Sequence, residues 1–265
     1  MKTVLLTLAL TVACMAGSTQ EAAFVESARA ATAIYQDRAV AIADGYRQIG
    51  RDFPAMGEHW INISLLFDGK IDAAHPEILS YIAIAGKPQL LGVAYLLPLL
   101  PDESPPDLPV RKELWHDHFR TIAEETELPQ HQANGHVAHA PRMAMLHAWI
   151  WLDNPAGMFA ADNWAIPFLR LGMRPDPAVP ESAAKAAALV SGGADYFTAS
   201  VRAAVPMTAK ESAKVDVAFA RARGEAETRY RSPQDLTAVW TALWKEVDQA
   251  LNAKSRSVLQ HLPVR

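Results

Sequence analysis

The stretch ILSYIAIAGKPQLLGVAYLL (residues 78–97) decides the fold that the sequence predicts. Its two halves, 78–85 and 90–97, are rich in the aliphatic and tyrosine residues that favour strands. Gly86, Lys87 and Pro88 lie between the halves, and glycine and proline at such a place are typical of a hairpin turn. We therefore predict two antiparallel strands joined by a short connection.

Two more segments have the pattern of strands. Residues 60–67 alternate in polarity over part of their length and are followed by Asp68 and Gly69, a turn dipeptide. Residues 145–152 alternate bulky side chains and end before a turn at 154–157. Together with the hairpin, these segments predict a small, mostly antiparallel sheet.

Helical patterns flank the sheet on both sides. Residues 21–49 are alanine-rich with an apolar stripe, and Gly50 is well placed to end a helix. From residue 181 the chain is again helical, with an interruption at Gly192 and Gly193.

The C-terminal third contains clear helix starts. Thr208 and Glu211 match a capping box, and Ser232 followed by Pro233 is typical of another helix start. Behind that start, Trp240 and Trp244 recur at helical spacing and are interpreted as core packing. The whole pattern predicts an α+β protein with an N-terminal helix, a small sheet and a helical C-terminal third.

Three regions follow from this reading. Residues 1–20 are predicted to be a signal peptide, 21–175 a His- and Trp-rich α+β domain, and 176–265 a helical region packed on it. The signal is Lys2, an apolar run at 4–12 and small residues after it. We therefore expect an exported protein, periplasmic or extracellular, whose mature chain begins between Cys14 and Glu21.

Cys14 is the only cysteine, so disulfides and cysteine-based zinc sites are excluded from the mature domain. A lipid anchor at Cys14 is an alternative, although Thr11 stands where lipoprotein signals usually carry leucine. No later apolar run is long enough to predict a transmembrane segment. The net charge is −4, and without a basic excess we expect no nucleic-acid partner. Serine-hydrolase, P-loop and dinucleotide-binding motifs do not occur in the sequence.

Histidine is concentrated in the middle of the chain. Eight of the nine histidines lie between His59 and His147, and five of the seven tryptophans lie between Trp60 and Trp164. Imidazole is a common ligand of zinc, copper, iron and nickel, and aromatic neighbours favour a dry pocket. The clustering is the best functional clue in the sequence.

His116-Asp117-His118 is the strongest local pattern. On an extended segment both imidazoles would point to one face, which is half of a typical metal site. The alternatives are a surface or hydrogen-bonding role, and catalysis without a metal.

His59 and His147 lie in or beside apolar runs that look buried. On a strand, His147 would share a face with Trp149 and Trp151. Each is either a hydrogen-bonded core histidine or a metal ligand or acid–base group, since a buried imidazole needs a partner. Candidate carboxylates, as ligands or as orienting groups, are Glu58, Glu113, Asp117 and Glu124.

The remaining soft or imidazole side chains are weaker candidates. His131, His136 and His139 are predicted to lie on a polar loop. Met56 and Met158 are potential Cu(I) ligands but are interpreted as packing residues.

Three motifs resemble those of uncharacterised secreted bacterial proteins with no established activity. They are MGxHW at 56–60, GVxY at 92–95 and LHxWxWxxNPxGMF at 146–159, and the resemblance spans roughly residues 45–165. That group often carries a glutamate where this chain has Ala94. If the glutamate is a ligand there, the resemblance implies that His116 or His118 completes the site here.

A weaker resemblance is to the cupin metal signature. His116, His118, Glu124 and His147 look like its three-histidine, one-glutamate set. The spacing before Glu124 is longer than usual, the flanking glycines are missing, and four strands are too few for a cupin barrel.

We therefore expect an exported soluble protein with a metal site built mainly from His59, His116, His118 and His147. A divalent transition metal is expected, copper or zinc first, with iron also open. If the protein is an enzyme, an open coordination position would activate water or oxygen. The alternative is a non-enzymatic exported protein that binds a small molecule or a partner and whose histidines are structural.

Overall fold

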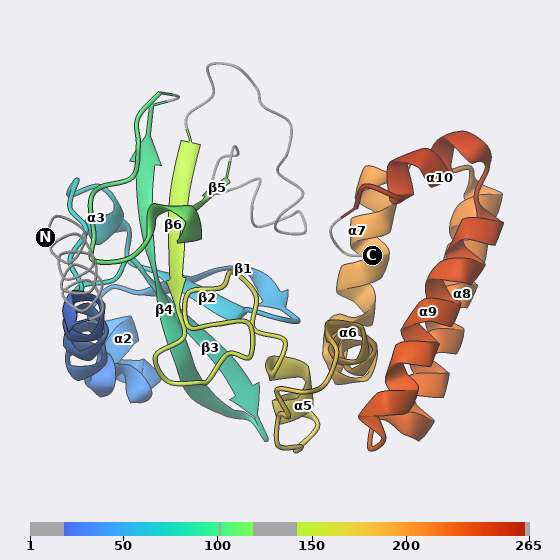
Figure 1. The fold of residues 1–265 in the computed structure, drawn as a ribbon, viewed down its shortest axis with the longest axis horizontal. Coiled ribbons are helices and arrows are strands. Elements are labelled where there is room, and N and C mark those ends of the chain that lie inside the picture. The colour runs from blue at the N-terminus through green and yellow to red at the C-terminus, as the bar shows by residue number, and fades with distance from the viewer. Residues whose placement is uncertain (1–18, 101, 119–141, 263–265) are drawn as a thin grey trace, which may run out of the picture.

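The computed structural model describes residues 19–100, 102–118 and 142–262 of the chain, which form three layers (Figure 1). A central sheet separates the helices near the N-terminus from a larger set of C-terminal helices. The predicted α+β class, with its N-terminal helix, antiparallel sheet and helical C-terminal third, is confirmed.

Six strands form the sheet in the described residues, and each neighbouring pair is antiparallel. The order across the sheet is β1-β2-β3-β4-β6-β5, so β1 and β5 lie at the edges. The strands are β1 (Arg47–Phe53), β2 (Gly57–Ile61), β3 (Ile78–Ile84), β4 (Lys87–Leu99), β5 (His116–His118) and β6 (Arg142–Ala148).

The predicted hairpin is confirmed as β3 and β4, with a tighter turn than the sequence suggested. Ala85 and Gly86 alone form the turn, with φ of +50° and +77°. Two positive φ values at the centre of a two-residue turn fit the twist of antiparallel strands. Lys87 and Pro88 already belong to β4, where they pair with Ile84 and Ala83.

The helix predicted over residues 21–49 is wrong in its second half. Residues 19–32 are helical, a 3₁₀ turn (Ala33–Gln36) and α2 (Arg38–Ala43) follow, and β1 begins at Arg47. Gly45 has φ +98°, which ends the helical path. The apolar spacing fitted a helix, but pairing of residues 47–49 with β2 outweighs that local preference.

The strand predicted over residues 60–67 is wrong beyond its first two residues. It ends at Ile61, because the Asn62 side chain accepts hydrogen bonds from the N–H groups of Ser64 and Leu65 and caps α3 (Ile63–Leu66). Asparagine is a preferred N-cap, so a local signal for this helix was present.

Strand β6 begins and ends earlier than the predicted 145–152. Trp149 and Trp151 lie beyond it and pack on opposite sides of the sheet. Trp149 joins the core with the C-terminal helices, while the Trp151 Nε1–H donates to Thr32 Oγ1 at 3.2 Å on the N-terminal helix. The prediction that both tryptophans share a strand face with His147 is therefore wrong.

The two faces of the sheet are covered by different helices. One face, which includes Tyr81, Tyr95 and Leu146, packs on Phe24 and Ala28 of the N-terminal helix. On the other face, the part that includes Ile82 and Leu91 packs on the C-terminal helices. The part that includes Ala94 and Met145 forms a small separate apolar cluster. His59, His116 and His147 lie on this second face.

The C-terminal helices are α5 (Ile166–Arg170), α6 (Glu181–Ala188), α7 (Ala194–Ala204), α8 (Ala209–Arg229), α9 (Pro233–Ala250) and α10 (Ala253–Leu259). The predicted interruption is confirmed as a kink at Ser191 and Gly192 between α6 and α7. The predicted capping box of Thr208 and Glu211 is present. No helix of the described residues is long and apolar enough to cross a membrane.

Gly57, at the start of β2, offers a test of this packing. Its φ is +73°, and a Cβ there would lie 2.2 Å from the backbone oxygen of Tyr81. We expect Gly57→Ala to destabilise the protein by about 2–3 kcal/mol, measured by urea unfolding, because β2 or β3 must shift. Gly86→Ala is the matched control, since its φ is +77° but nothing lies within 4 Å. Equal losses in the two variants would contradict the close packing of β2 on β3.

Candidate functional site

Three histidines from three strands lie on one face of the sheet. His59 on β2 is opposite Ser80 on β3, and Ser80 is opposite Gly92 on β4. Two residues further along β4, Ala94 is opposite His147 on β6. Residues directly opposite each other, and residues two apart on one strand, share a face.

His116 reaches the same face from the edge strand β5. It is opposite Met145, which is two residues before His147 on β6. The sheet therefore brings together three of the four histidines that the sequence proposed for the site.

The ring of His147 contacts the rings of both other histidines. Its ring centroid is 5.3 Å from that of His116 and 5.7 Å from that of His59. The ring of His116 is nearly parallel to that of His147, at 17°, whereas the ring of His59 is nearly perpendicular to it, at 78°. His59 and His147 are only 2% and 1% exposed, and His116 is half-buried.

Aromatic rings surround this histidine cluster, as the sequence suggested. Trp149 stacks on His147 with centroids 5.7 Å apart, and Phe53 contacts His59 edge to face at 5.7 Å. Trp149 is fixed in place, because its Nε1–H donates to the backbone oxygen of Ala160 at 2.7 Å and its backbone N–H to that of Met158 at 2.9 Å.

Gly92 makes this arrangement sterically possible. A Cβ at Gly92 would lie 2.6 Å from the backbone oxygen of Ala148 and 3.1 Å from the Cα of Trp149. The absence of a side chain lets the chain after β6 pass close over β4. Trp149 can therefore lie against His147 even though it is outside the strand.

Ser80 is a polar residue of the site that the sequence analysis missed. It is 1% exposed, and among the described residues its Oγ has no hydrogen-bond partner. A hydroxyl buried without a partner costs about 1–3 kcal/mol, so something usually meets it. The sequence does contain a sign of this residue, because Ser80 is a polar residue at the position between Ile78 and Ile82 on an otherwise apolar strand face.

The candidate carboxylates lie elsewhere. Glu58 is on the opposite face of β2, where it accepts from Arg38 and from the Trp60 Nε1–H at 3.1 and 3.0 Å. Asp117 is opposite Ala144, a residue of the N-terminal face, and Glu113 is exposed on a 3₁₀ turn (Lys112–Leu114). Glu124 lies outside the described residues.

The other histidines divide into two groups. His75 and His261 are exposed at the surface, with Nδ1 atoms 2.9 Å from Asp72 Oδ2 and 2.8 Å from the backbone oxygen of Ser257. His118 on β5 is opposite Met143 on β6, but its side chain is outside the described part, as are His131, His136 and His139 entirely.

As the side chains stand, no group of three or more His, Cys, Asp or Glu residues within the described ranges is arranged to hold a metal ion. The cluster thus consists of three imidazoles, in which His147 contacts both His59 and His116. Any metal bound there would require the rings to turn.

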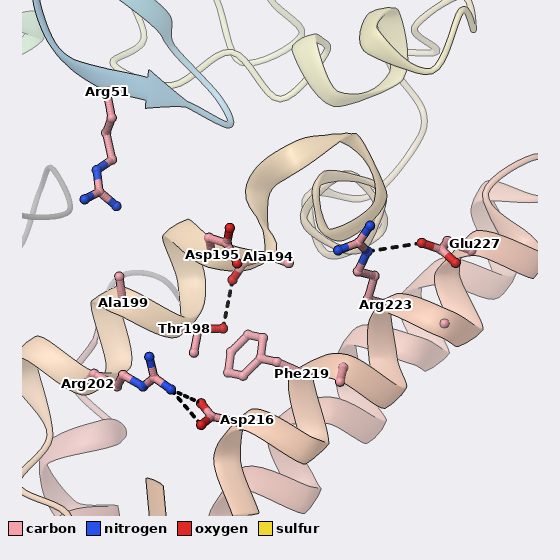
Figure 2. A pocket seen from close by; sticks show the side chains of 12 residues that line it. Arg51, Ala194, Asp195, Thr198, Ala199, Arg202, Asp216, Phe219, Arg223 and Glu227 are labelled. Atoms are coloured by element: carbon pink, nitrogen blue, oxygen red, sulfur yellow. Dashed lines mark hydrogen bonds and ion pairs between the residues drawn. The ribbon is translucent and has the colours of Figure 1, made fainter. Parts of the chain in front are cut away.

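A separate cavity of about 640 Å³ lies between β1 and helices α7 and α8 (Figure 2). Its charged side chains are mostly paired with each other: Arg202 with Asp216 at 2.6 Å, and Arg223 with Glu227 at 3.1 Å. Figure 2 shows Arg51 reaching toward α7 from the strand. Among the residues that the structure describes, no histidine or serine lines this cavity, so it is distinct from the histidine cluster.

Comparisons of the chain with known protein families, with curated proteins and with solved structures found no match.

Proposed function

We propose that the protein is an exported protein that binds a transition-metal ion, copper or zinc, with iron as a further candidate. His59, His116 and His147 are the proposed ligands. One observation carries the proposal: three separate strands place three imidazoles in contact on one largely buried face. Local sequence spacing does not produce that arrangement, because the three residues are far apart in the chain.

The separations of the rings suit a shared ion. An ion about 2.0–2.1 Å from a ligating nitrogen lies about 3.2 Å from the ring centroid, so two ligands at a tetrahedral angle have centroids about 5 Å apart. The observed separations are 5.3 and 5.7 Å. These separations support the proposal that the rings share one ion.

The ring orientations must change for ligation. The torsion between Cβ and an imidazole ring is broad, so a ring can turn without leaving its rotamer well. We propose that metal binding turns His116 or His59 so that its nitrogen converges with one from His147. His116 and His59 each contact His147, so His147 is the ligand common to either arrangement.

Ser80 gives independent support for a bound species at this place. Its partnerless hydroxyl is directly across from His59, where side chains of opposite residues have Cβ atoms about 4.5–5.5 Å apart. A water or anion held by the ion would supply a hydrogen-bond partner to Ser80. We expect Ser80 to orient that species rather than to ligate the metal.

Metal stoichiometry of untagged protein tests the proposal. We expect about one equivalent of copper or zinc by elemental analysis, and loss of most of it in His147→Gln, because glutamine is a poor substitute for an imidazole ligand. His116→Gln should also weaken binding, and as a half-buried residue of an edge strand it is the safer variant for folding.

His75→Gln is the matched control, because His75 is an exposed histidine outside the cluster. It should keep full metal. A His147→Gln variant that folds, as judged by circular dichroism, and keeps full metal would refute the proposal. That result would leave the histidines as structural residues.

A further inference from the structure

We infer that the ion is Cu(I) and that the thioether sulfur of Met145 is one of its ligands, together with His116 and His147. This inference rests on the proposed metal-binding function and specifies its ligand set. It rests on a pattern that the sequence analysis did not consider, in which two methionines and one histidine occupy every second position of β6.

Met143, Met145 and His147 occupy alternate positions of β6 and therefore share a face of the sheet. Met145 is also directly opposite His116 on β5, so it is the neighbour of one proposed ligand across the strands and of the other along the strand. Met145 is 6% exposed and belongs to the small apolar cluster beside the histidines. Met145 is thus the strand neighbour of both proposed imidazole ligands on one face.

The composition of the proposed ligand set favours a monovalent ion. The candidate carboxylates Glu58, Asp117 and Glu113 are not among these ligands, because they lie on the opposite face or at the surface. An imidazole that ligates a metal is neutral, as is a thioether, so the proposed set carries no negative charge of its own. Burying an ion in an apolar region costs more as its charge rises, and this ligand set therefore suits Cu(I) better than Zn(II).

The chemistry of the ligands points the same way. Thioether sulfur is a soft ligand that selects Cu(I), while imidazole serves both copper and zinc.

Competition with a chromogenic Cu(I) chelator, bathocuproine disulfonate, tests the inference on the full chain under anaerobic, reducing conditions. We expect Met145→Leu to lower the Cu(I) affinity at least about tenfold, as loss of a ligand or its support does at other metal sites. Leucine conserves the volume and apolar character of methionine, so the fold should persist. Zn(II) affinity should stay within about twofold of wild type.

Copper X-ray absorption supplies a second readout, independent of affinity. We expect a sulfur neighbour in the wild-type Cu(I) protein and its loss in Met145→Leu. Met207→Leu, at a half-buried methionine between α7 and α8, is the control and should retain both the affinity and the sulfur signal.

The two proposals fail differently. If Cu(I) and Zn(II) bind through the histidines but Met145→Leu keeps the Cu(I) affinity and no copper–sulfur signal is present, this inference is overturned and the metal-binding proposal stands. If the wild-type protein binds neither Cu(I) nor Zn(II), both are overturned.

Discussion

Trp240→Ala is expected to destabilise the protein by about 3–5 kcal/mol in urea unfolding, the usual cost of removing a buried aromatic ring. Trp240 is 4% exposed in the core of the C-terminal helices. Its ring contacts Phe197 on α7 with centroids 5.1 Å apart and Trp244 on α9 at 5.5 Å. Removing the ring leaves a cavity where α7 and α9 meet.

The same variant separates stability from function. Trp240 is in the helical layer, away from the histidine cluster on the sheet, so folded Trp240→Ala protein should keep its metal stoichiometry. Val217→Ala on α8, at a side chain that is 59% exposed, is the control and should cost less than about 0.5 kcal/mol. Metal loss from folded Trp240→Ala protein would show that the site is in the helical layer instead.

Glu77→Gln is expected to make the protein more stable than wild type at alkaline pH, by about 3–5 kcal/mol at pH 9. Glu77 is 1% exposed at the start of β3, and its Oε2 accepts a hydrogen bond from the Leu96 N–H at 3.0 Å. Burial raises the pKa of this carboxyl from 4.5 to about 8, although the Leu96 hydrogen bond lowers it; Asp68 and Asp72 raise it further.

The direction of the effect follows from the two pKa values. Between pH 4.5 and about 8 the folded protein keeps a proton on Glu77 that the unfolded chain has lost. The free energy of unfolding therefore falls as the pH rises through this window and is level above it. The full shift corresponds to at most about 5 kcal/mol. Glutamine resembles the protonated acid and can still accept from Leu96, so this pH dependence should vanish.

Unfolding measurements from pH 5 to pH 9 check the Glu77 prediction. The difference between wild type and Glu77→Gln should grow with pH up to about 8. Glu113→Gln, at an exposed carboxyl, should follow wild type. A difference that does not vary with pH would mean that Glu77 is ionised in the folded protein.

Much of the fold was predictable, because its signals are local. The hairpin of β3 and β4 follows from two strand-forming runs around a glycine turn, and the capping box of α8 from Thr208 and Glu211. Strand β1 was missed because an apolar helical stripe runs into it, and only pairing with β2 decides its structure. The ends of β2 and β6 were misjudged because Asn62 and Gly92 act through capping and close backbone approach.

The sequence pointed to histidines of the candidate site but not to their geometry. Histidine clustering pointed to His59, His116 and His147, yet only the strand order β2-β3-β4-β6-β5 shows that they share a face. The order cannot be read from spacing, since β6 lies between β4 and β5 although it follows both in the chain. Ser80 and Met145 were missed for the same reason, because only cross-strand pairing shows that each lies opposite a histidine.

The most direct test of the central claim is a Zn²⁺ titration followed by the imidazole nitrogen signals of ¹⁵N-histidine-labelled protein. The predicted result is that signals of His147 and of at least one of His59 and His116 move to metal-bound positions and saturate together at about one equivalent. His75 and His261, which are exposed and outside the cluster, should keep their positions. Saturable binding that leaves the signals of His59, His116 and His147 unchanged would contradict the account.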